Sequence, residues 1–130
     1  RNKRSSSKAS RGVIEFMKPD HVLFLLGISR KAGKLISGQE TVERAVNAKK
    51  VFLIIVSNDA SNNTKEKMKS LGIKGKIPVF YCYHSDELGK AIGKRQRKVI
   101  GITDKGLAKE IQRRIKLLTG VGDIDEITRV

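Results

Sequence analysis

The stretch VFLIIVS at residues 51–57 is a continuous apolar run rich in β-branched side chains. Such a run is typical of a central strand that is covered on both faces of a sheet. Two further apolar runs follow it, IPVFYCY at 77–83 and KVIGIT at 98–103, and a shorter run at 34–36 precedes it. We therefore expect three clear strands and a short fourth strand at 34–36.

Segments with helical periodicity separate these runs. Asp20 has the side chain of an N-cap, and Gly33 is a typical C-terminal stop for the first helix. We expect helices at residues 20–32, 38–48, 63–71, 85–93 and 105–118. This regular alternation of helices and strands predicts an α/β sandwich with helices on both faces of the sheet.

The third and fourth helices need caps of their own. Asp59 or Asn62 could cap the third helix, and Gly72 would end it. Ser85 is suited to cap the fourth helix. A capping box is not expected there, because Leu88 occupies the third helical position.

The chain divides by composition into three parts. Residues 1–18 are basic and serine-rich and cannot build a core, so we expect a flexible basic arm there, or else a linker or an expression remnant. Residues 19–119 carry the apolar patterns of a folded α/β domain. Residues 120–130 form a C-terminal tail.

The charge balance points to a polyanionic partner. Lys and Arg total 28 against 13 Asp and Glu, which gives a formal charge of +15. Such an excess costs stability through self-repulsion, so nucleic acid is the first candidate partner and an anionic membrane the second, with solubility alone as the alternative. No segment approaches the roughly 20 apolar residues of a membrane span, and the basic start is followed by serines rather than by a signal peptide's apolar run.

The groups needed for catalysis or metal binding do not cluster. His21 and His84 belong to different expected elements, and neither lies at ligand-type spacing from other metal-binding side chains. Cys82 lies within an expected strand, where a small buried apolar role is favoured, and a single cysteine fits a reducing compartment. No dinucleotide or P-loop motif occurs. We therefore expect a cytoplasmic protein that is not an enzyme and holds no cofactor or metal.

Residues 38–41 form the first candidate binding site. They open a helix, where backbone N–H groups lack partners and the dipole end is positive, so a phosphate can bind there. Gln39 can donate and accept, and Glu40 can accept from the edge of a guanine. Arg44, one turn further, can hold a phosphate or orient Glu40. The alternative is ordinary capping, with Ser37 as the cap and Glu40 as its reciprocal partner.

The second candidate site is LGKAIGKRQRK at residues 88–98, where glycines permit close backbone approach. The alternative is a solvated basic loop. A third polar cluster, SNDASNNTK at 57–65, is better explained by turn formation. The glycines and cations of the second site are Gly89, Lys90, Gly93, Lys94, Arg95, Arg97 and Lys98.

Four motifs in order, LLGISRKAGKLISGQET, VFLIIVSNDASNNT, IPV and LGKAIGK, resemble the L-seven-Ae ribosomal protein superfamily, and most of all its bacterial YlxQ-like branch. The likeness covers residues 20–118. It implies a three-layer α-β-α sandwich around a small mixed sheet of about four strands. It also implies binding of RNA, typically of kink-turns or similar internal loops, through the helix that opens at Gly38 and the glycine loop after Leu88.

The resemblance can be carried over position by position. The family has a G-x-N-E stretch with a basic residue three positions after the Glu. Alignment on Gly38 places Glu40 and Thr41 at the Asn-Glu positions, which hold the sheared guanines of a kink-turn, and Arg44 at the basic one. A shift by one residue would place Gln39 and Glu40 there, but it breaks the downstream register. Gly89 and Gly93 match the loop glycines of the family, and Ile92 matches one of its apolar loop residues.

We therefore expect a monomeric, ribosomal or ribosome-associated protein that binds structured RNA, with ribosomal proteins as further partners. Phosphates would be held by the basic residues, and base edges would be read by Gln39, Glu40 and Thr41. The rival hypotheses are an adaptor whose basic surface meets an acidic protein, and an accessory domain of an RNA-modifying enzyme. The expected RNA-binding residues are Lys34, Gly38, Gln39, Glu40, Thr41, Arg44, Gly89, Lys90, Ile92, Gly93, Lys94, Arg95 and Arg97.

Overall fold

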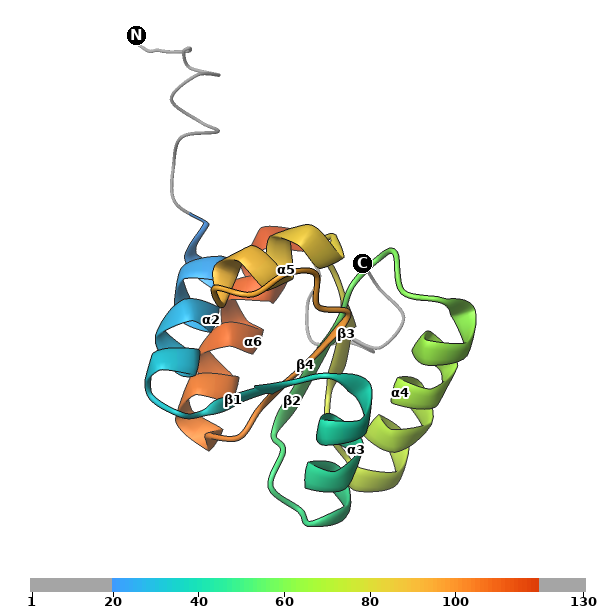
Figure 1. Ribbon diagram of the computed structural model, residues 1–130. Helices are drawn as coiled ribbons and strands as arrows, with labels where there is room; N and C mark the ends of the chain where they lie inside the picture. Colours follow the sequence, from blue (N-terminus) through green and yellow to red (C-terminus); the bar gives the residue numbers. More distant parts are fainter. Residues whose placement is uncertain (1–19, 120–130) are drawn as a thin grey trace, which may run out of the picture.

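The computed structural model describes residues 20–119, so the expected arm at 1–18 and the tail at 120–130 lie outside the described residues. Helices and strands alternate along the described chain, as the sequence predicts (Figure 1). In chain order the elements are α2 (His21–Lys31), β1 (Leu35–Ser37), α3 (Gln39–Asn47), β2 (Leu53–Val56), α4 (Asn62–Gly75), β3 (Val79–Tyr81), α5 (Ser85–Ala91), β4 (Val99–Ile102) and α6 (Lys105–Thr119).

The four strands form one mixed sheet in the order β1-β4-β2-β3. β4 runs antiparallel to both of its neighbours, and β2 runs parallel to β3. Ile54 of β2 is paired with Gly101 on one side and with Val79 on the other, so this strand is central to the sheet. The expected small mixed sheet is therefore confirmed.

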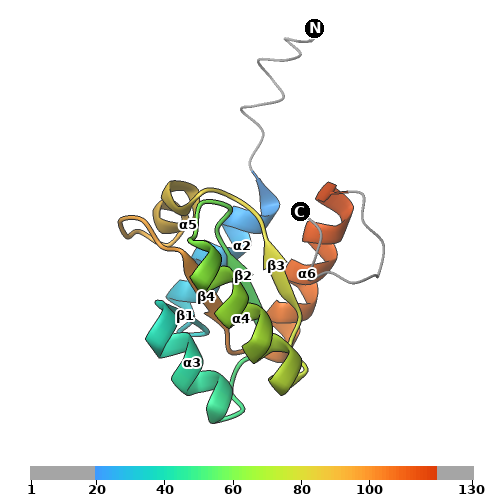
Figure 2. The ribbon, with the colours of Figure 1, turned by 90° about the vertical axis from the view of Figure 1, so that its right-hand side faces the viewer.

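Helices cover both faces of the sheet, which gives the expected three-layer α-β-α sandwich. α2, α5 and α6 lie on one face, and α3 and α4 lie side by side on the other (Figures 1 and 2). Side chains alternate along β2, so that Leu53 and Ile55 pack in the core under α2, α5 and α6, whereas Ile54 and Val56 pack under α3 and α4. All four side chains are fully buried, as expected of the apolar run at 51–57.

The boundaries of α2 agree with the sequence. The Asp20 carboxylate accepts hydrogen bonds from the backbone N–H groups of Val22 and Leu23, at 2.9 and 3.1 Å. Gly33, just after the helix, has a φ of +74°, which glycine adopts at little cost.

The expected end and cap of the third helix are wrong. Ser61 caps α4, because its hydroxyl accepts from the N–H of Thr64 at 3.1 Å. The helix continues through Gly72 to Gly75. Gly72 is needed for packing rather than for a turn, since a Cβ there would collide with the side chain of Val79 on the adjacent strand.

The expected cap of the fourth helix is displaced by one residue. His84 caps α5 through Nδ1, which accepts from the N–H of Asp86 at 3.2 Å. Glu87 completes a capping box, because its carboxylate accepts from the N–H of His84 at 2.9 Å. Ser85 is instead the first helical residue, and its hydroxyl is free to bond elsewhere.

Cys82 directly follows β3 and is 8% exposed. Burial, together with the negative charges of Asp20 and Glu87, raises the pKa of its thiol to about 12. The thiol is therefore protonated at neutral pH, which agrees with the expected role of a small buried residue.

Candidate nucleic-acid interface

The start of α3 has no side-chain cap. Gly38 is the N-cap residue, at a φ of 102°, and no side chain caps the helix. The expected alternative, with Ser37 as the cap and Glu40 as its partner, is therefore wrong. The N–H of Gly38 donates to the carbonyl of Val99 at 2.9 Å, which ties the helix start to β4. The first-turn N–H groups after Gly38 are consequently available to an anionic ligand.

The two clusters predicted from the sequence meet at this helix start. Nε of Arg97, in the loop after α5, donates to the hydroxyl of Ser37 at 3.2 Å. The N–H of Arg97 also donates to the carbonyl of Ser85 at 3.1 Å, so the backbone of this loop is anchored to the start of α5. The opening of α3 and the basic loop at 93–98 thus form one surface.

A shallow hollow of about 450 Å³ lies where α3, α4 and the basic loop converge. We call it the interface hollow. Six of its eight lining residues have polar or charged side chains, two of them cationic, and such groups suit contact with a nucleotide backbone. The lining residues are Ser37, Gly38, Gln39, Thr64, Gln96, Arg97, Lys98 and Val99.

Gln39 is oriented by a contact from α4. Its Oε1 accepts a hydrogen bond from the hydroxyl of Thr64 at 3.0 Å, and this hydroxyl in turn accepts from that of Ser61 at 3.1 Å. The amide NH₂ of Gln39 is then the group left to donate to a ligand. The cluster at 57–65, expected to serve only in a turn, therefore contributes Thr64 to the hollow.

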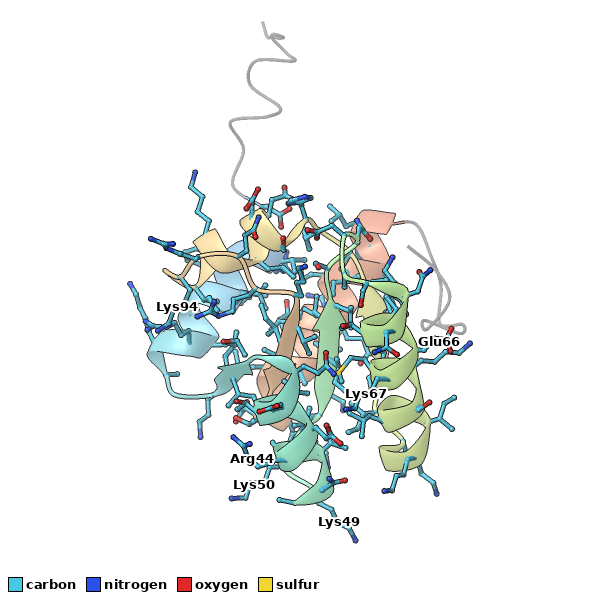
Figure 3. All side chains as sticks on the ribbon, turned by 45° about the vertical axis from the view of Figure 1, so that its right-hand side comes forward. Arg44, Lys49, Lys50, Glu66, Lys67 and Lys94 are labelled. Carbon is cyan, nitrogen blue, oxygen red and sulfur yellow. The ribbon has the colours of Figure 1, made fainter. Side chains whose placement is uncertain are left out.

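Glu40 and Arg44 lie exposed on α3, beyond the hollow. No ion pair joins them in the described part of the chain, so Arg44 does not orient the Glu40 carboxylate. Thr41 is half-buried beside Gly38. Arg44, Lys50 and Lys49 gather toward the end of α3, whereas Lys94 extends from the loop after α5 (Figure 3).

Two glycines shape the basic loop. A Cβ on Gly89 would collide with the carbonyl of Arg95. The backbone that approaches this glycine closely is therefore the protein's own loop. Gly93 has a φ of +71° and reverses the chain after α5, and the N–H of Lys94 donates to the carbonyl of Gly89 at 2.8 Å. This fold-back leaves Lys90, Lys94 and Arg95 exposed.

Two expected site residues lie away from the hollow. Ile92 is 2% exposed and belongs to the core under α2 and α6, so its side chain faces the core rather than the surface at the hollow. Lys34 is exposed, but it precedes β1, whereas Gly38 follows the other end of that strand. Its carbonyl accepts from the N–H of Thr103 at the far end of β4.

Asp59 holds the start of α5 in place. Its carboxylate accepts from the hydroxyl of Ser85 at 2.6 Å and from the N–H of Ser85 at 2.9 Å. The hydroxyl bond, more than any other contact, holds the pKa of the Asp59 carboxyl well below its usual range. Because the Ser85 carbonyl accepts from Arg97, Asp59 indirectly positions the basic loop.

Sequence reasoning missed four contributors to this surface. Asp59 and Ser85 were considered only as possible caps, and Thr64 and Gln96 lie within the quoted clusters but were assigned no binding role. Gln96 donates to the Asp86 carboxylate at 2.8 Å and so ties the loop to α5. The sequence offered one signal for these contacts, namely the many polar side chains before and after the strand at 77–83. That signal does not specify which side chains bond to each other.

Within residues 20–119, no group of three or more His, Cys, Asp or Glu side chains could hold a metal ion. None of the helices in this range is long and apolar enough to cross a membrane.

The fold and the open helix start beside a glycine-anchored basic loop define the class of protein. The family model described as "Ribosomal protein L7Ae/L30e/S12e/Gadd45 family" matches residues 20–112, and the chain belongs to this family.

Two relatives and one solved structure show which members of the family this chain is similar to. The chain is 39% identical over 92 residues to RNA-binding protein YlxQ of Enterococcus faecium, covering 71% of this chain and 88% of that protein. It is 32% identical over 87 residues to RNA-binding protein YlxQ of Bacillus subtilis (strain 168), covering 67% and 87%. A solved structure described as "a protein with unknown function from Bacillus halodurans C" superposes with a TM-score of 0.74 at 37% identity, covering 75% of this chain and 99% of that one. The chain thus falls in the YlxQ-like branch of the family.

Proposed function

We propose that this chain is a non-catalytic protein that binds structured RNA at the interface hollow and the basic loop beside it. The observation that carries the proposal is the contact between Arg97 and Ser37, which joins an uncapped helix start to a loop of exposed cations. The family and the two relatives named as RNA-binding proteins support the same conclusion.

In this proposal, different groups of the surface contact the phosphates and the bases of the RNA. The N–H groups at the start of α3 and the side chains of Lys94, Arg95 and Arg97 hold phosphates, which fixes the position of the RNA but carries no sequence information. The amide NH₂ of Gln39 donates to a base acceptor, and the exposed Glu40 carboxylate accepts from the N1 and N2 groups of a guanine.

We propose a kinked internal loop, such as a kink-turn, as the RNA element that fits this site. A kink exposes base edges next to a sharply bent backbone, and single-stranded or distorted elements are where proteins read RNA sequence. In this chain Gln39 and Glu40, rather than an Asn-Glu pair, would contact the sheared guanines. Association with ribosomal RNA in the cytoplasm, as a monomer, is part of the same proposal.

A salt titration tests the proposal. The probes are a hairpin with a kinked internal loop containing sheared G·A pairs and a fully paired hairpin of equal length. If about five phosphates are neutralised, the logarithm of the binding constant should fall against the logarithm of salt concentration with a slope of about −3.5 to −4.5. Tighter binding of the kinked RNA is expected, and a slope near zero would refute the proposal.

Two variants with the same charge change make the test specific. Arg95→Ala removes a cation of the loop and should lower the steepness of the salt slope by about 1 for both RNAs. Lys109→Ala removes an exposed cation from α6, on the other side of the sheet, and should leave the slope unchanged. Binding by an acidic protein that persists after nuclease treatment, with no RNA retained, would favour the adaptor hypothesis instead.

A further inference from the structure

A second hollow, of about 540 Å³, lies at the opposite end of α3 from the interface hollow. It opens between the C-terminal ends of α3 and α4 and the chain that enters β2 and β3. Its rim carries Lys49, Lys74 and Lys76, and no carboxylate lines it among the described residues. We call it the lysine hollow. Its volume lies within the range of about 300–1,000 Å³ that is usual for ligand pockets.

Two of the rim lysines occupy backbone positions that favour glycine. Lys49 and Lys76 have φ values of +59° and +57°, in the left-handed region that follows the ends of α3 and α4. A side chain other than glycine or asparagine is uncommon there and costs stability. That both positions carry lysine, and that both lysines reach the same hollow, indicates a use for the charge beyond ending a helix.

The floor of the lysine hollow suits a flat apolar group. Val51 and Ile77 are buried at its base, and Phe52 remains 37% exposed beside them. Gly75 packs closely against this floor, because a Cβ there would lie 2.9 Å from the Ile77 side chain and 3.3 Å from that of Val46. An exposed aromatic ring beneath a rim of lysines matches the two halves of a nucleotide, since the base stacks on the ring and the phosphate pairs with the cations.

We propose that the lysine hollow binds an unpaired nucleotide of the same RNA that occupies the interface hollow. This inference rests on the proposed function. The nine residues of α3 span only about 13 Å, less than the roughly 34 Å of one duplex turn, so one RNA molecule can reach both ends of the helix. Arg44 and Lys50 lie near Lys49 toward the C-terminal end of α3, beside the lysine hollow (Figure 3).

Two versions of the kinked hairpin separate this inference from the proposed function. In one version the 5′ and 3′ ends are paired with each other. The other version carries four unpaired nucleotides at its 5′ end and four at its 3′ end. The paired version tests the interface hollow alone. We expect the unpaired nucleotides to tighten binding by wild-type protein about fivefold or more, as stacking of one base on an aromatic ring does.

The lysine double variant Lys49→Gly/Lys76→Gly removes two charges at positions where glycine relieves backbone strain, so folding should not suffer. It should lower the steepness of the salt slope by about 2 for the extended RNA and abolish most of the gain from the extension. The matched control Lys105→Ala/Lys109→Ala removes two exposed charges from α6 and should retain the whole gain.

Phe52→Ala removes the exposed ring of the hollow without changing charge, and we expect it also to abolish the gain while leaving binding of the paired hairpin intact. Equal gains in wild type and in both hollow variants would overturn the inference and leave the proposed function standing. Failure of wild type to bind the paired and the extended hairpin would overturn both. If the extension gives no gain, and polyglutamate binds wild type but not the lysine double variant, the hollow takes an acidic protein segment and the inference is overturned.

Discussion

Single side chains determine how the two halves of the interface meet. Arg97 bonds to Ser37 across the start of α3, Thr64 fixes the orientation of Gln39, and Gly89 leaves room for the returning loop. The first two contacts join residues 60 and 25 positions apart, the third is local, and each can be removed by a small substitution. Their contributions to RNA binding and to stability can therefore be measured separately.

Thr64→Val should reduce the preference for kinked RNA. The substitution keeps the shape of the side chain but removes the hydroxyl that donates to Gln39, so the amide loses its fixed orientation. A neutral hydrogen bond contributes about 1 kcal/mol, so affinity for the kinked hairpin should fall about fivefold while affinity for the paired hairpin stays constant. Thr103→Val, at the far end of β4, is the matched control. Equal losses on both RNAs would show that Gln39 does not read a base.

Gly89→Ala should disturb the basic loop. The added methyl group meets the carbonyl of Arg95, so either the loop or α5 must shift, at a cost of about 1–3 kcal/mol in the free energy of unfolding. Gly106→Ala, in the first turn of α6, is the control, because its Cβ has no neighbour closer than 3.4 Å. Urea denaturation compares the two, and an unchanged free energy of unfolding for Gly89→Ala would contradict the collision.

At the scale of helices and strands, the sequence predicted which elements form, but not how they are capped. Periodicity and β-branched runs are local signals, and they placed the ends of α2, β2 and α6 to within two residues. Several neighbouring residues can cap the same helix, and the sequence alone does not decide between them. Ser61 displaced Asn62 and Asp59, and His84 displaced Ser85, because Asp59 and Ser85 bond to each other across the sheet edge. The contact of Ser37 depends on a residue 60 positions away, and no local pattern encodes it.

The bond between Asp59 and Ser85 should make stability depend on acid pH. The pKa of the Asp59 carboxyl is lower in the folded chain than the value of about 3.9 expected when unfolded, so the unfolded chain binds more protons in acid. Its contribution is present above about pH 4 and is lost as the pH falls through the folded-state pKa.

Ser85→Ala and Asp59→Asn test this linkage. Both should be less stable than wild type at pH 7 and should lose less stability than wild type between about pH 4 and pH 2, as measured by thermal unfolding. Parallel curves for all three proteins would show that the bond does not stabilise the fold. Asn62→Ala, next to the true cap of α4, serves as a control and should follow the wild-type curve.

The whole molecule combines a well-packed two-sided core with a large excess of positive charge. Two apolar clusters, one on each face of the sheet, hold the three layers together. The formal charge of +15 opposes that compaction. Composition alone predicts this excess of charge and a polyanionic partner. The location of the binding surface could not be predicted from it, because that location depends on the topology that brings Gly38 and Val99 together.

Screening should therefore stabilise the free protein. Raising ionic strength from about 0.01 M to about 0.15 M shortens the Debye length from about 30 Å to about 8 Å, and we expect Tm to rise. Lys105→Glu/Lys109→Glu lowers the net charge on α6, away from the proposed interface, and should flatten this dependence. A Tm that falls with salt in wild type would mean that attractive charge pairs outweigh the repulsion.

The position of β4 between β1 and β2 has a consequence for synthesis of the chain. β1 has no partner strand until residues 99–102 exist, and the N–H of Gly38 has no acceptor until Val99 arrives. A nascent chain that ends before that point displays lysines and arginines but cannot assemble the site that would use them. The surface can therefore form only after residues 99–102 have been synthesised, and any shorter nascent chain lacks it.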